Sequence, residues 1–144
     1  MPAHSRLSVI AFSGDYDRVH YALAMASAAA AVNRPVTLFF TMGAVRALRH
    51  DSADGVPGWV GLAPAADGAS PAARDAHHAG AGIATFEELL SACVELGVTV
   101  MVCEMGLKAE DMTAADLRPD VPVREGGLVT FYADAGEDGK IVFV

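Results

Sequence analysis

Short apolar runs alternate with stretches of helical periodicity along most of the chain. The clearest run covers residues 98–102, is mostly β-branched, and is bounded by Gly97 and Gly106. An unbroken apolar run of this length is typical of a strand buried on both faces, as in a parallel sheet. Similar runs predict further strands at residues 7–12, 36–40, 121–123 and 140–144.

Helical segments lie between these strands. Thr85 and Glu88 have the spacing of a capping box, and Gly97 ends the helix that follows. Besides this helix at 86–96, we expect helices at 18–32, 44–48, 113–117 and 126–135. The alternation predicts an α/β fold, a mainly parallel five-stranded sheet with helices on both faces.

Residues 50–82 break this pattern. Glycine, alanine, proline and aspartate dominate the segment, and no clear periodicity is present. We therefore expect a Gly/Ala/Pro-rich loop inserted into the domain, either a mobile surface loop or a lid. Trp59 would anchor a lid or a subunit contact, since a lone large aromatic side chain usually packs against something. The adjacent pair His77 and His78 is only a weak signal for a metal site.

Composition and charge narrow the class of protein. The chain has 144 residues, enough for one domain over 1–144, and a net charge of −8 that disfavours nucleic acid as a partner. The longest apolar run, 21–32, is too short to span a bilayer, and the first residues lack the apolar stretch of a signal peptide. We expect a cytoplasmic protein whose two cysteines remain thiols.

Candidate chemistry gathers where the predicted strands end. In parallel α/β sheets, sites lie beyond the carboxyl ends of the strands, and Cys103 stands at such an end. We expect loops at 13–17, 41–43 and 103–106 to meet there. The helix N-termini would favour a thiolate, whereas an inward-pointing Glu104 carboxylate would oppose it. The residues expected around Cys103 are Gly14, Asp15, Met42, Gly43, Glu104 and Met105.

Each candidate has a structural alternative. Cys103 could be a small buried apolar side chain, and Cys93 lies on the apolar face of its predicted helix. A disulfide between them is conceivable if that face meets the strand end. Gly14 and Gly43 belong to no G-x-G-x-x-G motif or P-loop, so the sequence gives little support for nucleotide binding. We expect no cofactor and no metal.

Several segments together resemble the DsrE/DsrF-like proteins of the sulfur-relay superfamily. The matching stretches are FSGDYDR at 12–18, VTLFFTMGAV at 36–45, EELL at 87–90, GVTVMVCEM at 97–105 and ADL at 115–117. The resemblance implies a flavodoxin-like three-layer sandwich that assembles as trimers or hexamers. It also implies that Cys103 carries sulfur as a persulfide.

The leading hypothesis is a sulfur-relay protein that acts as a sulfurtransferase-type persulfide carrier. Cys103 would take sulfane sulfur from a donor protein and pass it to an acceptor thiol on another protein, since the chain lacks the Cys-Pro-x-Pro signature of small sulfur carriers. One alternative is a non-catalytic oligomeric binding module of the same fold. The other is a thiol redox protein that uses Cys103 with Cys93.

Overall fold

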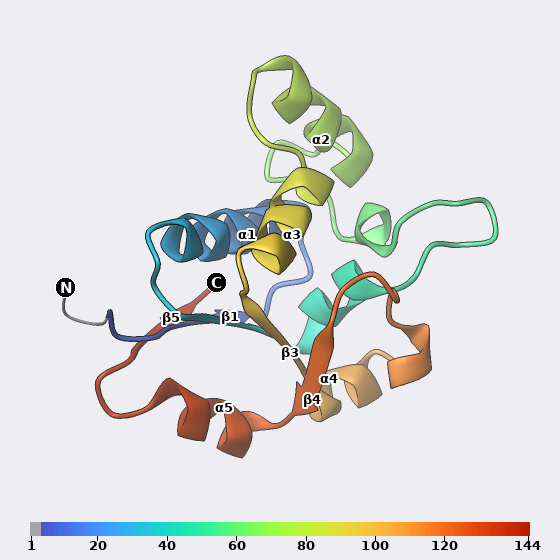
Figure 1. Cartoon of the computed structure of the whole chain (residues 1–144). Coiled ribbons are helices and arrows are strands. Elements are labelled where there is room, and N and C mark those ends of the chain that lie inside the picture. The colour runs from blue at the N-terminus through green and yellow to red at the C-terminus, as the bar shows by residue number, and fades with distance from the viewer. Residues whose placement is uncertain (1–3) are drawn as a thin grey trace.

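A five-stranded, wholly parallel sheet forms the centre of the protein (Figure 1). The computed structural model describes residues 4–144. The strands are β1 (Leu7–Ala11), β2 (Val36–Phe40), β3 (Thr99–Cys103), β4 (Val123–Gly126) and β5 (Lys140–Phe143), in the order β4-β3-β2-β1-β5. The predicted α/β fold with a mainly parallel five-stranded sheet is confirmed.

Helices cover both faces of this sheet and complete the three layers. Helices α1 (Tyr16–Ala31) and α3 (Phe86–Glu95) lie together on one face, and α5 (Leu128–Ala135) lies on the other (Figure 1). Asp15 caps α1 by accepting a hydrogen bond from the Arg18 backbone N–H. The capping box of Thr85 and Glu88 at the start of α3 is present as predicted. Local sequence thus fixes where α1 and α3 begin.

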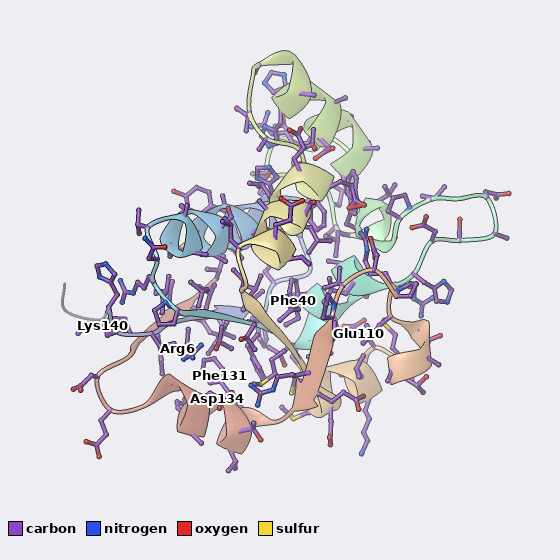
Figure 2. All side chains as sticks on the ribbon, viewed as in Figure 1. Arg6, Phe40, Glu110, Phe131, Asp134 and Lys140 are labelled. Carbon is purple, nitrogen blue, oxygen red and sulfur yellow. The ribbon has the colours of Figure 1, made fainter. Side chains whose placement is uncertain are left out.

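Strand residues alternate between two separate apolar clusters. Val100 and Val102 of β3 belong to a large cluster with α1 and α3, whereas Met101 and Cys103 face α5. The α5 cluster is small and consists of Ile10, Phe39, Met101, Cys103 and Phe131. Figure 2 places Phe131 between α5 and the sheet, where its ring centroid lies 4.8 Å from that of Phe39.

The segment 50–82 contains more regular structure than the sequence indicated. It holds the 3₁₀ helix η2 (Gly58–Gly61) and the α-helix α2 (Pro71–Gly80). The loop prediction is wrong for α2, where Ser70 accepts a hydrogen bond from the Ala73 N–H and Pro71 begins the helix. Ser70 and Pro71 are typical of a helix start, but the segment is rich in glycine and alanine and shows no apolar periodicity that would have predicted a helix.

Buried aromatic contacts hold this segment against α1 and α3. Trp59 is 6% exposed and stacks on Phe86 at 5.0 Å between ring centroids. The Tyr16 hydroxyl donates to Asp75 at 2.5 Å, and the same carboxylate oxygen accepts the Phe86 N–H at 2.7 Å. Trp59 therefore packs inside its own chain.

Several element boundaries differ from the sequence predictions, and η1 and α1 begin inside the loops expected at 41–43 and 13–17. Residues 103–106 are not a loop, because α4 (Glu104–Ala109) begins directly after β3. The fourth strand extends to Gly126, which pairs with Cys103, so α5 starts at Leu128 and not at Gly126. The described chain contains the further 3₁₀ helices η1 (Met42–Leu48) and η3 (Ala114–Asp116). None of its helices has the length and apolar character needed to cross a membrane.

Candidate functional site

Cys103 occupies the junction between the central sheet and a helix. It is the last residue of β3 and the N-cap of α4, with an extended backbone conformation. Its side chain faces the α5 side of the sheet and is 1% exposed. The neighbouring strand residue, Val102, points into the opposite core. The sulfur is therefore held on a rigid support, close to the surface on the less covered face.

A close backbone approach fixes the direction in which α4 leaves the sheet. Gly106 lies against the start of η1, where an added Cβ atom would stand 2.5 Å from the Met42 nitrogen and 3.0 Å from the Thr41 Cα atom. Because those neighbours are backbone atoms, a larger side chain would displace the helix. Gly106 thus lets α4 pack tightly on η1 and determines where Glu104 and Met105 project.

A groove of about 490 Å³ adjoins Cys103. Met105 and Leu128 on its walls are 55% and 43% exposed, respectively. The N-cap residues of α4 and α5, Cys103 and Gly127, both line the groove. Among the described residues, no side chain caps the N-terminus of either helix. The complete lining is Cys103, Glu104, Met105, Lys108, Gly127 and Leu128.

The sequence predicted part of this lining. Glu104 and Met105 lie beside Cys103 as expected, but Lys108, Gly127 and Leu128 were missed. Lys108 follows Glu104 by one helical turn, so recognising α4 would have identified it. Gly127 and Leu128 reach the groove because β4 pairs with β3, which brings Gly126 opposite Cys103.

The four predicted residues from the first two loops lie outside the groove lining. The backbones of Gly14 and Gly43 press together, since a Cβ atom on Gly43 would stand 3.0 Å from the Gly14 Cα atom. Asp15 serves as the α1 cap and accepts a hydrogen bond from the Ser13 hydroxyl at 2.6 Å. Met42 opens η1 with φ of 47°. These residues therefore shape the junctions of β1 and β2 with the following helices.

Cys93 has a different environment. It is fully buried in the α1 and α3 core, and its thiol donates to the Leu23 carbonyl at 3.5 Å. Burial raises the pKa of the Cys93 thiol to about 12. Cys93 and Cys103 are both free and belong to clusters on opposite faces of the sheet. This separation argues against a disulfide between them.

The histidine pair does not form a metal site in the described part of the chain. His77 is exposed, whereas His78 is buried with its ring centroid 4.6 Å from that of His20. Within residues 4–144, no three histidine, cysteine, aspartate or glutamate side chains are placed to share a metal ion. His78 instead contributes to the contact between α2 and α1.

A second hollow lies near Arg118, between α3 and the segment before β4. The Arg118 guanidinium donates two hydrogen bonds to Glu87, at 2.8 and 2.9 Å, and two to Asp120, at 2.7 and 2.8 Å. These bonds hold the pKa of Asp120 below its ordinary value. The hollow contains no thiol, and the Arg118 charge is already paired with Glu87 and Asp120, so we assign Arg118 a structural role.

Comparison with known proteins places the fold in a family. The sequence profile described as the DsrE/DsrF-like family matches residues 7–143. The chain belongs to the DsrE/DsrF-like family. The resemblance found in the sequence is thereby confirmed, and the match covers the groove and all five strands.

Relatives and solved structures agree with this assignment. The chain is 28% identical over 157 residues to "Sulfur carrier protein DsrE2" of Allochromatium vinosum, covering 96% of this chain and 98% of that protein. It is 27% identical to the uncharacterized protein YrkE of Bacillus subtilis, covering 96% of each.

Two solved structures share the fold. MTH1491 of Methanobacterium thermoautotrophicum, a protein of unknown function, aligns with a TM-score of 0.62 and 17% identity over 97% of this chain and 99% of that one. The YchN protein of E. coli aligns with a TM-score of 0.58 and 15% identity over the same shares.

Proposed function

We propose that this protein is a sulfur carrier in a sulfur relay, with Cys103 as the residue that holds the sulfur. The observation that carries the proposal is the placement of the two thiols. Cys103 adjoins a groove at the end of β3, whereas Cys93 is enclosed in the core. Family membership and the relative named as a sulfur carrier support the same function.

The proposed step is thiol–persulfide exchange. The Cys103 thiolate attacks the outer sulfur of a donor persulfide, forming a new S–S bond to Cys103. The donor's own S–S bond breaks, and its electron pair leaves on the donor thiolate. In the second step, an acceptor thiolate attacks the outer sulfur of the Cys103 persulfide. The S–S bond at Cys103 breaks, and Cys103 leaves as a thiolate. No external oxidant or reductant is needed.

The two uncapped helix starts supply donors for the anions in this exchange. The first N–H groups of α4 follow Cys103 directly, and those of α5 follow Gly127 across the groove. Unpaired N–H groups and the helix dipole favour negative charge at such positions. An anionic sulfur atom held in the groove could accept hydrogen bonds from these N–H groups.

Intact-protein mass spectrometry after treatment with inorganic polysulfide tests the proposal. The wild type and Cys93→Ser should gain one sulfur atom that a reductant removes, and Cys103→Ser should not. Cys93→Ser is the matched control because it removes the other thiol of the chain. No mass gain in the wild type, or an equal gain in Cys103→Ser, would contradict the assignment.

The low exposure of Cys103 favours one alternative, a binding module that uses the same groove without covalent chemistry. Exposed Met105 and Leu128 would then contact a ligand or partner directly. In that case Cys103→Ser should leave partner binding intact, and the wild type should gain no sulfur. A loss of binding in a folded Cys103→Ser protein would count against this alternative.

We also propose that the carrier works as a homo-oligomer, a trimer or hexamer, with separate donor and acceptor proteins. Large apolar side chains remain exposed around α5 and β5, among them Val129 at 86%, Phe143 at 66% and Tyr132 at 59%. Large apolar side chains left exposed in this way are typical of an interface. A monomeric mass in sedimentation equilibrium would contradict this part of the proposal.

The proposed location is the cytoplasm, where a reducing environment keeps both thiols free. Both cysteines are unpaired in the structure. Recovery of the protein from an extracytoplasmic fraction after cell fractionation would contradict this location.

A further inference from the structure

Lys108 is the basic residue of the groove at Cys103. It lies in the last turn of α4 and shares a helix face with Glu104, one turn earlier. Both side chains also line an adjacent hollow of about 250 Å³, which contains Leu107, Met112 and Glu125. Glu104 and Lys108 therefore separate the two hollows, and within the described chain no other basic side chain lines either of them.

Within residues 4–144, the ammonium group of Lys108 has no salt-bridge partner. The salt bridges among residues 4–144 involve arginines only, and neither Lys108 nor Glu104 takes part in them. The Lys108 side chain is exposed. A positive charge thus remains available beside the thiol.

This charge matters because the protein as a whole repels anions. The net charge is −8, and Glu104 stands directly next to Cys103. Persulfides, polysulfides and thiosulfate, the common forms of sulfane sulfur, carry negative charge near neutral pH. Without a local cation, an acidic surface would lower the concentration of such a substrate at the groove.

We propose that Lys108 is a positioning residue that makes the Cys103 groove selective for anionic sulfane-sulfur substrates. The proposal rests on Cys103 as the sulfur carrier and adds the charge class of the substrate. With thiosulfate, the Cys103 thiolate bonds to the outer sulfur, the S–S bond of thiosulfate breaks, and sulfite leaves with the electron pair. The product, a Cys103 persulfide anion, would lie within the field of the Lys108 ammonium group.

The test compares iodoacetate with iodoacetamide as alkylating agents for Cys103. The two reagents are similar in size and differ in charge, so the ratio of their rate constants measures the preference of the groove for an anion. Peptide mapping would locate the modified thiol. Lys108→Met should lower the iodoacetate-to-iodoacetamide ratio about threefold to tenfold, the effect of one partly screened charge.

Matched variants separate this effect from a general change in charge. Lys140→Met removes the only other lysine, which lies on β5 at the far edge of the sheet from β4, and should leave the ratio unchanged (Figure 2). Lys108→Arg should retain the wild-type ratio, and Glu104→Gln should raise it. An unchanged ratio in Lys108→Met, an equal change in Lys140→Met, or failure of both reagents to modify Cys103 in the folded protein would overturn the proposal.

Alkylation requires no sulfur transfer, so the two proposals can fail separately. A lowered ratio in Lys108→Met together with no sulfur uptake by the wild type would overturn the carrier function and leave only the preference of the groove for anions. Sulfur uptake with an unchanged ratio would overturn the role of Lys108 alone.

Discussion

The layers that cover the two faces of the sheet differ in size, and each face carries one cysteine. On one face, α1, α3 and the 50–82 segment enclose a large core that includes Cys93. On the other, the eight-residue helix α5 covers a cluster of five side chains that includes Cys103. Burial raises the pKa of Cys93 to about 12, while a groove opens beside Cys103. The thiol on the better covered face should therefore be the less reactive of the two.

This difference shows how a single strand can serve stability and chemistry together. Along β3, Val100 and Val102 pack into the large core, and Met101 and Cys103 face α5. Alternation along a strand guarantees this separation. A substitution on the large-core side should therefore change the free energy of unfolding most, and one on the α5 side should change access to Cys103 most.

The largest expected effect is a loss of stability when either of two fully buried phenylalanines is replaced by alanine. Phe86→Ala should lower the free energy of unfolding by about 3–5 kcal/mol, because the closely packed rings of Tyr16 and Trp59 cannot fill the cavity. Phe131→Ala should cost about 2–3 kcal/mol, since α5 can settle onto a smaller cluster. Urea denaturation measures both free energies.

The alkylation rate of Cys103 should change in the opposite order. Phe131 shares the apolar cluster of Cys103, so Phe131→Ala should speed alkylation by iodoacetamide, whereas Phe86→Ala should not. A greater loss of stability in Phe131→Ala than in Phe86→Ala would show that the α5 side is the better packed one.

The sequence predicted the central part of this arrangement well. Mostly apolar runs located β1, β2 and β3, because strands buried on both faces are apolar at most positions. Turn and cap residues then gave α1 and α3. Cys103 could be placed at a strand end by local pattern alone.

The rest depended on contacts between distant segments. The groove needs Gly127 and Leu128 beside Cys103, which follows from the register of β4 on β3. The sequence near 121–126 is too short and polar to reveal that register. In the 50–82 segment, the hydrogen bonds of Asp75 to Tyr16 and Phe86 hold α2 in place, and such pairings leave no local pattern.

A smaller effect should follow from the loss of one buried hydroxyl. Tyr16 is fully buried and donates to Asp75, so Tyr16→Phe should lower the free energy of unfolding by about 1–3 kcal/mol. Limited proteolysis should then cut more readily within 50–82. Tyr132→Phe is the matched control on the α5 side, where the exposed side chain should make its effect smaller than about 0.5 kcal/mol. Equal effects in the two variants would remove the distinction between the faces.

The smallest expected effect is a pH dependence confined to the large-core side. His78 stacks on His20 and is surrounded by Tyr16, Arg74, Asp75 and His77. Burial lowers the pKa of His78, and the charges of His20 and Arg74 lower it further, although Asp75 opposes them. The unfolded chain therefore binds this proton at a higher pH than the folded chain does.

The sign of the pH effect follows from this difference. Stability is fully present above the ordinary histidine pKa of about 6.5 and falls as the pH drops toward the lowered pKa of the folded state, by at most about 1.4 kcal/mol per pH unit. His78→Phe keeps an aromatic ring on His20 but cannot take up the proton, so its free energy of unfolding should change less between about pH 7.5 and pH 5.5. His77→Phe, at the exposed neighbouring position, should keep the wild-type pH dependence. If both variants kept it, the acid sensitivity would have to arise outside the contact between α2 and α1, and the two faces would no longer differ in their response to pH.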